Sequence, residues 1–183
     1  MTTSLAVYSR VAGAFCVLCG LSLLLAPGQT RTLAQRFPRN RIAGWLLTGV
    51  DLAWAGWFLY NATFLAELPL ARRLVIILMP VVFLLIVFLL DELLASRALG
   101  GLLLLIPQPI LSAAYLHPSR MRLIMTVLAY VLAVLGMILV LSPYRLRQWT
   151  TGSLMRTDRR TRISGAVLVN AGLCLVCLGM MIY

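Results

Sequence analysis

The chain has 183 residues, of which 62% are hydrophobic and only 11% are charged, and its mean hydropathy is +0.98. A soluble domain carries about 25% charged residues and roughly 45–50% apolar ones. A water-soluble fold of this size could not hide so much apolar surface. The composition therefore excludes a soluble globular protein and predicts an all-α integral membrane protein, whose helices are surrounded by lipid.

Apolar runs separated by charged or proline-containing breaks predict a single transmembrane domain, a bundle of about six helices. At about 20 residues per span, no length is left for a soluble domain. The expected spans are about 4–26, 42–66, 74–90, 98–116, 123–141 and 163–183. The first run could be a signal peptide, but Pro27 follows the small residue where cleavage would fall, so a retained helix is expected.

The fourth expected span is irregular. Gly100 and Gly101 open it, and Pro107 and Pro109 interrupt it. Proline removes a backbone donor and breaks the helical hydrogen-bond ladder. This pattern predicts a kinked or re-entrant helix whose backbone is covered by neighbouring protein.

The net charge of +11 comes entirely from arginine and is concentrated in two loops. With six spans both loops face one side, which the positive-inside rule makes cytoplasmic, with both termini outside a prokaryotic inner membrane. Five spans would place the loops on opposite sides. The arginines of these loops are Arg31, Arg36, Arg39, Arg41, Arg145, Arg147, Arg156, Arg159, Arg160 and Arg162.

Both basic loops also contain apolar side chains at helical spacing, Leu33 and Phe37 in the first, Leu146 and Trp149 in the second. This arrangement predicts short amphipathic helices at the membrane interface. The arginines then either set the topology alone or contact anionic lipid headgroups or a protein partner. Because they adjoin apolar spans, lipid phosphate is favoured over nucleic acid.

An internal repeat is expected. The segment 20–27, which begins with glycine and ends with proline, resembles segment 136–143. Each copy is followed by a basic loop and then by Arg41-Ile-Ala-Gly44 or Arg162-Ile-Ser-Gly165. Spans 1–2 and 5–6 therefore read as two hairpins in the same orientation, a parallel repeat.

Asp51 is the principal polar candidate, because it lies roughly 13 Å into the second span. A carboxyl group at that depth must be neutral, paired, or facing a polar cavity. Gly44, Thr48, Asp51 and Ala55 form one stripe suited to close helix contact. The alternatives are a structural hydrogen bond or intersubunit pair, a proton or cation pathway, and a ligand contact. Asn170 is expected to form an interhelical hydrogen bond.

Two Cys-x-x-Cys pairs lie in the first and last spans, at Cys16 and Cys19 and at Cys174 and Cys177. Such pairs can hold a metal or a redox disulfide. Cys16-Val-Leu-Cys19 resembles the Cys-Val-Leu-Cys of membrane thiol oxidases that pass electrons to quinone. The resemblance covers four residues and implies a thiol–quinone oxidoreductase. Packing is favoured instead, because the ridges Ala12, Cys16, Gly20 and Ala166, Asn170, Cys174 consist of small residues.

No catalytic constellation is complete. His117 is the sole histidine and lies in a turn, while Asp91 and Glu92 at the end of the third span can pair with Arg97. Trp45, Trp54, Trp57 and Tyr60 suit interfacial or packing roles, or a groove for a pigment or quinone. No cofactor is demanded.

Three functions are therefore considered for the chain. The favoured one is a non-catalytic accessory or scaffold subunit packed against larger membrane proteins, as energy-transducing complexes carry. The second is a small proton- or cation-coupled transporter or channel that uses Asp51. The third is the thiol–quinone oxidoreductase.

Overall fold

The computed structural model describes residues 2–61, 69–89, 93–115, 119–150 and 157–181, and these residues are helical without any strand. Five helices are long and apolar enough to cross a membrane. They are Leu5–Leu25, Arg41–Tyr60, Leu94–Tyr115, Arg122–Leu141 and Asp158–Met181. At the third predicted span the apolar helix Arg73–Leu89 is shorter than these. An all-helical chain with several apolar helices is thus confirmed.

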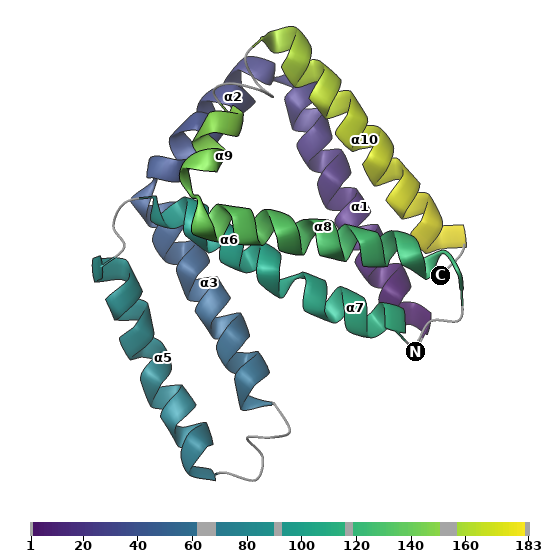
Figure 1. Ribbon diagram of the computed structural model, residues 1–183. Helices are drawn as coiled ribbons and strands as arrows, with labels where there is room; N and C mark the ends of the chain where they lie inside the picture. The colour runs from purple at the N-terminus through teal and green to yellow at the C-terminus, as the bar shows by residue number, and fades with distance from the viewer. Residues whose placement is uncertain (1, 62–68, 90–92, 116–118, 151–156, 182–183) are drawn as a thin grey trace.

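The elements follow one another along the chain with short connections (Figure 1). They are α1 (Thr2–Leu25), α2 (Pro27–Arg36), the 3-10 turn η1 (Phe37–Arg39), α3 (Arg41–Tyr60), α5 (Pro69–Leu89), α6 (Leu94–Leu105), α7 (Pro107–Tyr115), α8 (Arg122–Leu141), α9 (Tyr144–Gln148) and α10 (Asp158–Met181). The two predicted amphipathic segments are helical, as α2 and α9. The predicted interruption of the fourth span is also present, since Ile106 separates α6 from α7 and Pro107 begins α7.

The most extensive helix contact joins α1 to α10, which lie side by side in Figure 1 although they are far apart in sequence. Their contact is made by glycines. A Cβ on Gly13 would lie 2.7 Å from the Gly172 carbonyl oxygen, and a Cβ on Gly20 would lie 2.8 Å from the Gly165 carbonyl oxygen. The two backbones therefore touch directly, as small residues allow in membrane helices.

Two polar side chains reinforce this contact. The Ser9 hydroxyl donates to the Leu175 carbonyl oxygen at 2.6 Å, and Arg10 Nε donates to the Gly179 carbonyl oxygen at 2.9 Å. Ser9 is completely buried. Hydrogen bonds to backbone carbonyls across an apolar contact satisfy donors that lipid cannot satisfy.

The remaining helices pack in a branched arrangement. Helix α8 lies against α6 and α7, α6 also crosses α3, and α5 packs mainly on α3. A buried apolar cluster forms where α1, α7, α8 and α10 meet. Its members are Leu5, Ile110, Ala114, Met125, Ala129 and Leu175. In Figure 1 the α3–α5 pair projects away from this cluster.

The predicted hairpins are not packed hairpins. Neither α1 with α3 nor α8 with α10 is among the extensive contacts of the described residues. Helices α2 and α9 carry the chain away, so that α1 packs on α10 and α8 on α6 (Figure 1). The two helices of each predicted hairpin therefore do not pack on each other, despite the sequence similarity between the hairpins. The repeat stays a prediction.

The predicted packing ridges are confirmed at Gly20 and are wrong elsewhere by one or two residues. On α10, Gly165 and Gly172 are buried in the contact with α1, whereas Asn170 and Cys174 are exposed. The Asn170 side chain donates to the Ala166 carbonyl oxygen of its own helix at 3.0 Å, and it forms no interhelical hydrogen bond with the described residues. On α1 the ridge runs through Gly13 and Gly20 because glycine permits a closer approach than alanine or cysteine.

Candidate intramembrane polar site

The polar site lies where α3 crosses α6, and small residues bring the helices together there. A Cβ on Gly44 would lie 3.1 Å from the Ala95 nitrogen and 3.3 Å from Leu94 side-chain atoms. One to two turns later, a Cβ on Gly101 would meet the side chain of Asp51. Residue numbers increase along both helices together, so α3 and α6 run in the same direction through the crossing.

Asp51 points directly at α6. Its Oδ2 would lie 2.7 Å from a Cβ on Gly101, so the carboxyl group occupies the space that any larger residue would fill. The Oδ1 atom is buried and has no hydrogen-bond partner among the described residues. An unpaired carboxyl oxygen between two membrane helices is costly, which marks the position as more than a packing contact.

Thr48 lies one turn before Asp51 on the same face of α3. Its side chain is 5% exposed, and its buried Oγ1 also lacks a partner within the described ranges. Residues three apart on a helix share a face. Thr48 and Asp51 therefore present two buried oxygen atoms to the same interface.

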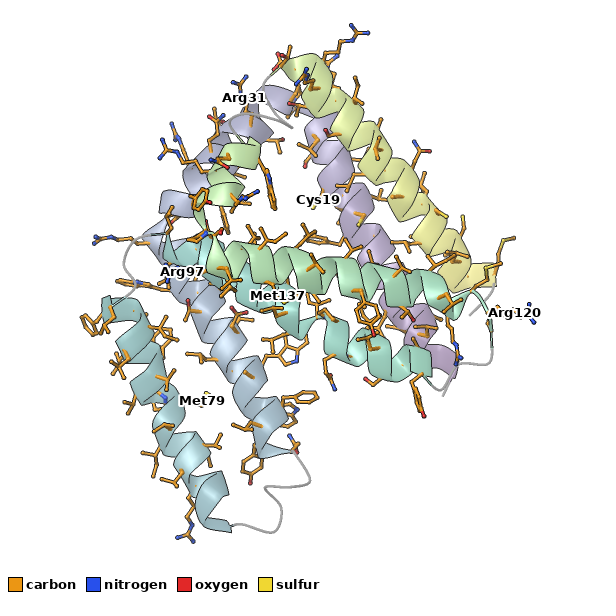
Figure 2. The ribbon with its side chains drawn as sticks, in the orientation of Figure 1. Cys19, Arg31, Met79, Arg97, Arg120 and Met137 are labelled. Carbon is orange, nitrogen blue, oxygen red and sulfur yellow. The ribbon has the colours of Figure 1, made fainter. Side chains whose placement is uncertain are left out.

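Helix α6 adds Arg97, whose buried Nε has no hydrogen-bond partner in the described part of the chain. Ser96 is completely buried and its Oγ also lacks a partner there, but it lies four residues before Gly100, on the face of α6 that contacts α8. Arg97 precedes Gly101 by four residues, so it lies on the face of α6 that meets Asp51. Figure 2 places Arg97 at the end of α6 that crosses α3. A carboxyl group, a hydroxyl group and a guanidinium are thereby brought to one crossing.

This set can hold a proton on the carboxyl group, or use oxygen atoms to bind water or a small cation. Ionisable groups inside a membrane mark pathways for protons and ions. Asp51 was found from the sequence because an acid interrupts an apolar run. Arg97 was missed as a site residue, because it was assigned to Asp91 and Glu92. The signal that identifies it is an arginine four residues before a glycine that faces the acid.

The structure forms no disulfide among the four cysteines. Cys16 and Cys19 are partly exposed on α1, Cys174 and Cys177 are exposed on α10, and all four are free thiols. No group of three histidine, cysteine or acidic side chains within the described ranges could hold a metal ion. Asp91, Glu92, His117 and Arg156 lie outside the described residues, as does the side chain of Arg39.

The remaining arginines lie on four elements. Arg31 and Arg36 are on α2, Arg41 begins α3, Arg145 and Arg147 are on α9, and Arg159, Arg160 and Arg162 are in the first turns of α10. Helix α2 contacts both α1 and α10, and Figure 2 shows Arg31 near the end where α1 stops and α10 begins. The arginines of α2 and α10 therefore lie at the same end of this pair.

Comparison with known proteins gives one match. The model of a family described as an uncharacterized protein conserved in bacteria (DUF2065) matches residues 124–179, from α8 through α9 into α10. No curated protein and no solved structure matches the chain. The similarity covers less than half of the sequence, points to bacteria, and names no activity.

Proposed function

We propose that this chain is a non-catalytic accessory or scaffold subunit of a larger membrane protein complex. The observation that carries the proposal is the exposure of the α3–α5 pair. Helix α5 packs mainly on α3, and Ile77, Phe88 and Leu89 are 63%, 78% and 75% exposed. A helix that packs against the rest of the chain on one side has its other faces available. Neighbouring transmembrane helices can pack on these faces by van der Waals contact.

The proposed topology has six spans, with α5 as the third, in a prokaryotic inner membrane. The basic segments α2 and α9 and the start of α10 then face the cytoplasm, and both termini face outward. Their arginines would contact anionic lipid headgroups or partner subunits. The co-location of Arg31 with the start of α10 at one end of the α1–α10 pair supports this placement.

Purification from native membranes in mild detergent tests the subunit role, with mass and absorbance read on the same peak. We expect a complex larger than the chain, with fixed stoichiometry, and its spectrum will show which cofactors the assembly carries. A small homo-oligomer without other subunits would contradict the proposal.

Site-specific crosslinking makes this test sharper. A photoreactive residue at Ile77, on the exposed face of α5, should crosslink to another protein in intact membranes. The matched control is Ser9, which is fully buried between α1 and α10. A photoreactive residue there should give only crosslinks within the chain. Equal patterns at the two positions would argue against a partner on α5.

A second candidate is a small proton- or cation-coupled transporter or channel. The specific observation in its favour is that Thr48 Oγ1, Asp51 Oδ1 and Arg97 Nε are buried without a hydrogen-bond partner among the described residues. In reconstituted vesicles Asp51→Asn should abolish flux, because it removes the only acid of the set. Asp158→Asn, at the start of α10, is the control and should leave flux unchanged. Unchanged flux in Asp51→Asn would exclude this candidate.

A further inference from the structure

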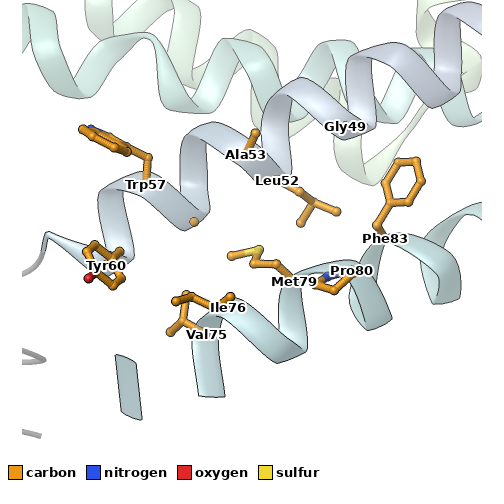
Figure 3. Close-up of a pocket in the computed structure, with 11 residues that line it drawn as sticks. Gly49, Leu52, Ala53, Trp57, Tyr60, Val75, Ile76, Met79, Pro80 and Phe83 are labelled. Atoms are coloured by element: carbon orange, nitrogen blue, oxygen red, sulfur yellow. The ribbon is translucent and has the colours of Figure 1, made fainter. Parts of the chain in front are cut away.

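An apolar groove runs between α3 and α5 (Figure 3). Its volume is about 580 Å³, within the range of roughly 300–1,000 Å³ typical of ligand pockets. Helix α3 contributes three small residues to one wall, with Leu52, Trp57 and Tyr60 beside them, and bulky residues of α5 form the other wall. The principal lining residues are Gly49, Ala53 and Gly56 on α3 and Met79, Pro80 and Phe83 on α5.

The groove continues toward the start of α3. A second hollow of about 490 Å³ is lined by Ile42, Trp45 and Leu46 and shares Gly49, Ala53 and Phe83 with the first. The two hollows therefore form one apolar strip along a single face of α3. From Ile42 to Tyr60 this strip is roughly 27 Å long, close to the thickness of about 30 Å of a hydrocarbon core.

A polar cleft lies immediately before this strip in the chain. Its volume is about 540 Å³, and it is lined by Thr32, Gln35, Arg36 and Asn40. Asn40 is the N-cap of α3: its Oδ1 accepts from the backbone nitrogens of Ile42 and Ala43 at 3.1 and 3.3 Å. Ile42, two residues on, begins the apolar strip.

The chemistry of the cleft favours a phosphate group. Arg36 supplies a guanidinium, and Gln35 and Asn40 supply amide donors, while no acidic side chain of the described residues lines the cleft. Arginine binds phosphate with two parallel hydrogen bonds, and such charge-assisted bonds are about twice as strong as neutral ones. A phosphate site beside an apolar strip fits an amphiphile, whose charged head would bind in the cleft and whose hydrocarbon chain would lie along the strip.

We propose that α2, η1, α3 and α5 bind one anionic glycerophospholipid, with its phosphate in the cleft of Arg36 and Asn40 and one acyl chain along α3. An acyl chain reaches about half the hydrocarbon thickness, roughly 15 Å, which corresponds to α3 from Ile42 to Leu52. A transmembrane helix, about 10–12 Å across, is wider than a hydrocarbon chain and has no phosphate to place in the cleft. The proposal is independent of the subunit role.

Native mass spectrometry of the purified chain tests the site, using phosphatidylglycerol and phosphatidylcholine with identical acyl chains as probes. The first bound phosphatidylglycerol should resist removal at detergent levels that strip phosphatidylcholine. Equal retention of the two lipids by the wild-type chain would overturn the proposal.

Arg36→Gln tests the head site. We expect about a tenfold loss of phosphatidylglycerol affinity. The matched control is Arg31→Gln, which removes the same charge from the same helix but does not line the cleft. It should change the affinity less than twofold. Equal losses in both variants would mean diffuse attraction to the basic surface and would contradict a built site.

Ala53→Phe tests the chain site by filling the groove near the expected end of the acyl chain. It should weaken binding of both lipids, because the filled groove excludes hydrocarbon whatever the headgroup. The control is Val167→Phe on the exposed face of α10, where Val167 is 64% exposed. Identical binding by the two variants would overturn the placement of the acyl chain.

Discussion

The α1–α10 pair and the α3–α5 pair consist of similar apolar helices but pack in opposite ways. In the first pair glycine faces glycine: a Cβ on Gly172 would lie 2.7 Å from the Gly13 carbonyl oxygen. In the second pair glycine faces long side chains. The only atom of the described residues near a Cβ on Gly49 would be a ring atom of Phe83, at 3.8 Å. A Cβ on Gly56 would lie 3.2 Å from the Met79 side chain.

In these two pairs, the glycines bring the helices into backbone contact only where they face glycines of the opposite helix. Opposed glycines let two backbones touch, whereas Met79 and Phe83 hold α5 at the length of their own side chains. This separation leaves a groove of about 580 Å³ between α3 and α5. The closed pair serves stability, and the open pair offers a surface for a lipid or another helix.

The largest effect is expected for Gly172→Ala in the closed pair. The added methyl group would overlap the Gly13 carbonyl oxygen and Val17, which lie 2.7 and 2.8 Å from the Cβ position. We expect a loss of about 1–3 kcal/mol in the free energy of unfolding, measured by denaturant titration in mild detergent. Gly28→Ala, with no atom within 4 Å of its Cβ position, is the control. Equal stability of the two variants would refute backbone contact between α1 and α10.

A smaller effect is expected for Ser9→Ala, which removes the buried hydrogen bond to the Leu175 carbonyl oxygen. Interhelical hydrogen bonds in membrane proteins contribute about 0.6 kcal/mol on average and at most about 1.7 kcal/mol. The same titration should therefore show a loss of about 1 kcal/mol. Ser112→Ala removes only exposed bonds to the Gln108 and Pro109 carbonyl oxygens of its own helix and should be nearly neutral. A neutral Ser9→Ala would show that the glycines alone hold the pair.

The smallest effect is expected for Gly49→Ala in the open pair, and its sign is opposite. The new methyl group meets only Phe83, and alanine restricts the unfolded chain, so the variant should gain about 0.5 kcal/mol. A loss as large as that of Gly172→Ala would mean that α3 and α5 are packed as closely as α1 and α10, and the comparison would fail.

The helices themselves could be predicted because hydropathy and charge are local. The fifth span was expected at 123–141 and α8 is Arg122–Leu141. Partners could not be predicted in the same way, since a small residue shows where a helix can be approached but not by which helix. Gly20 and Gly136, equivalent in the expected repeat, lie against Gly165 of α10 and Gly100 of α6 respectively.

Only part of the candidate site could be predicted, again because the sequence does not show which helices pack together. Asp51 is conspicuous within an apolar segment, but Arg97 follows two acids and so resembled part of a surface charge pair. Its relation to Asp51 depends on the α3–α6 crossing. Three buried glycines each follow an arginine by three residues, at Gly44, Gly100 and Gly165. Only the structure shows that each of them marks a helix crossing.

The pairing of α1 with α10 also has a consequence for biosynthesis. Helix α1 leaves the ribosome long before α10, because residues 26–157 must be translated between them. At about 5–20 residues per second this delay is on the order of ten seconds. Throughout it, Ser9 and Arg10 lack the carbonyl groups of Leu175 and Gly179. The α1–α10 contact therefore cannot form until the helices between them have been synthesised, and α1 spends this interval without its main packing partner.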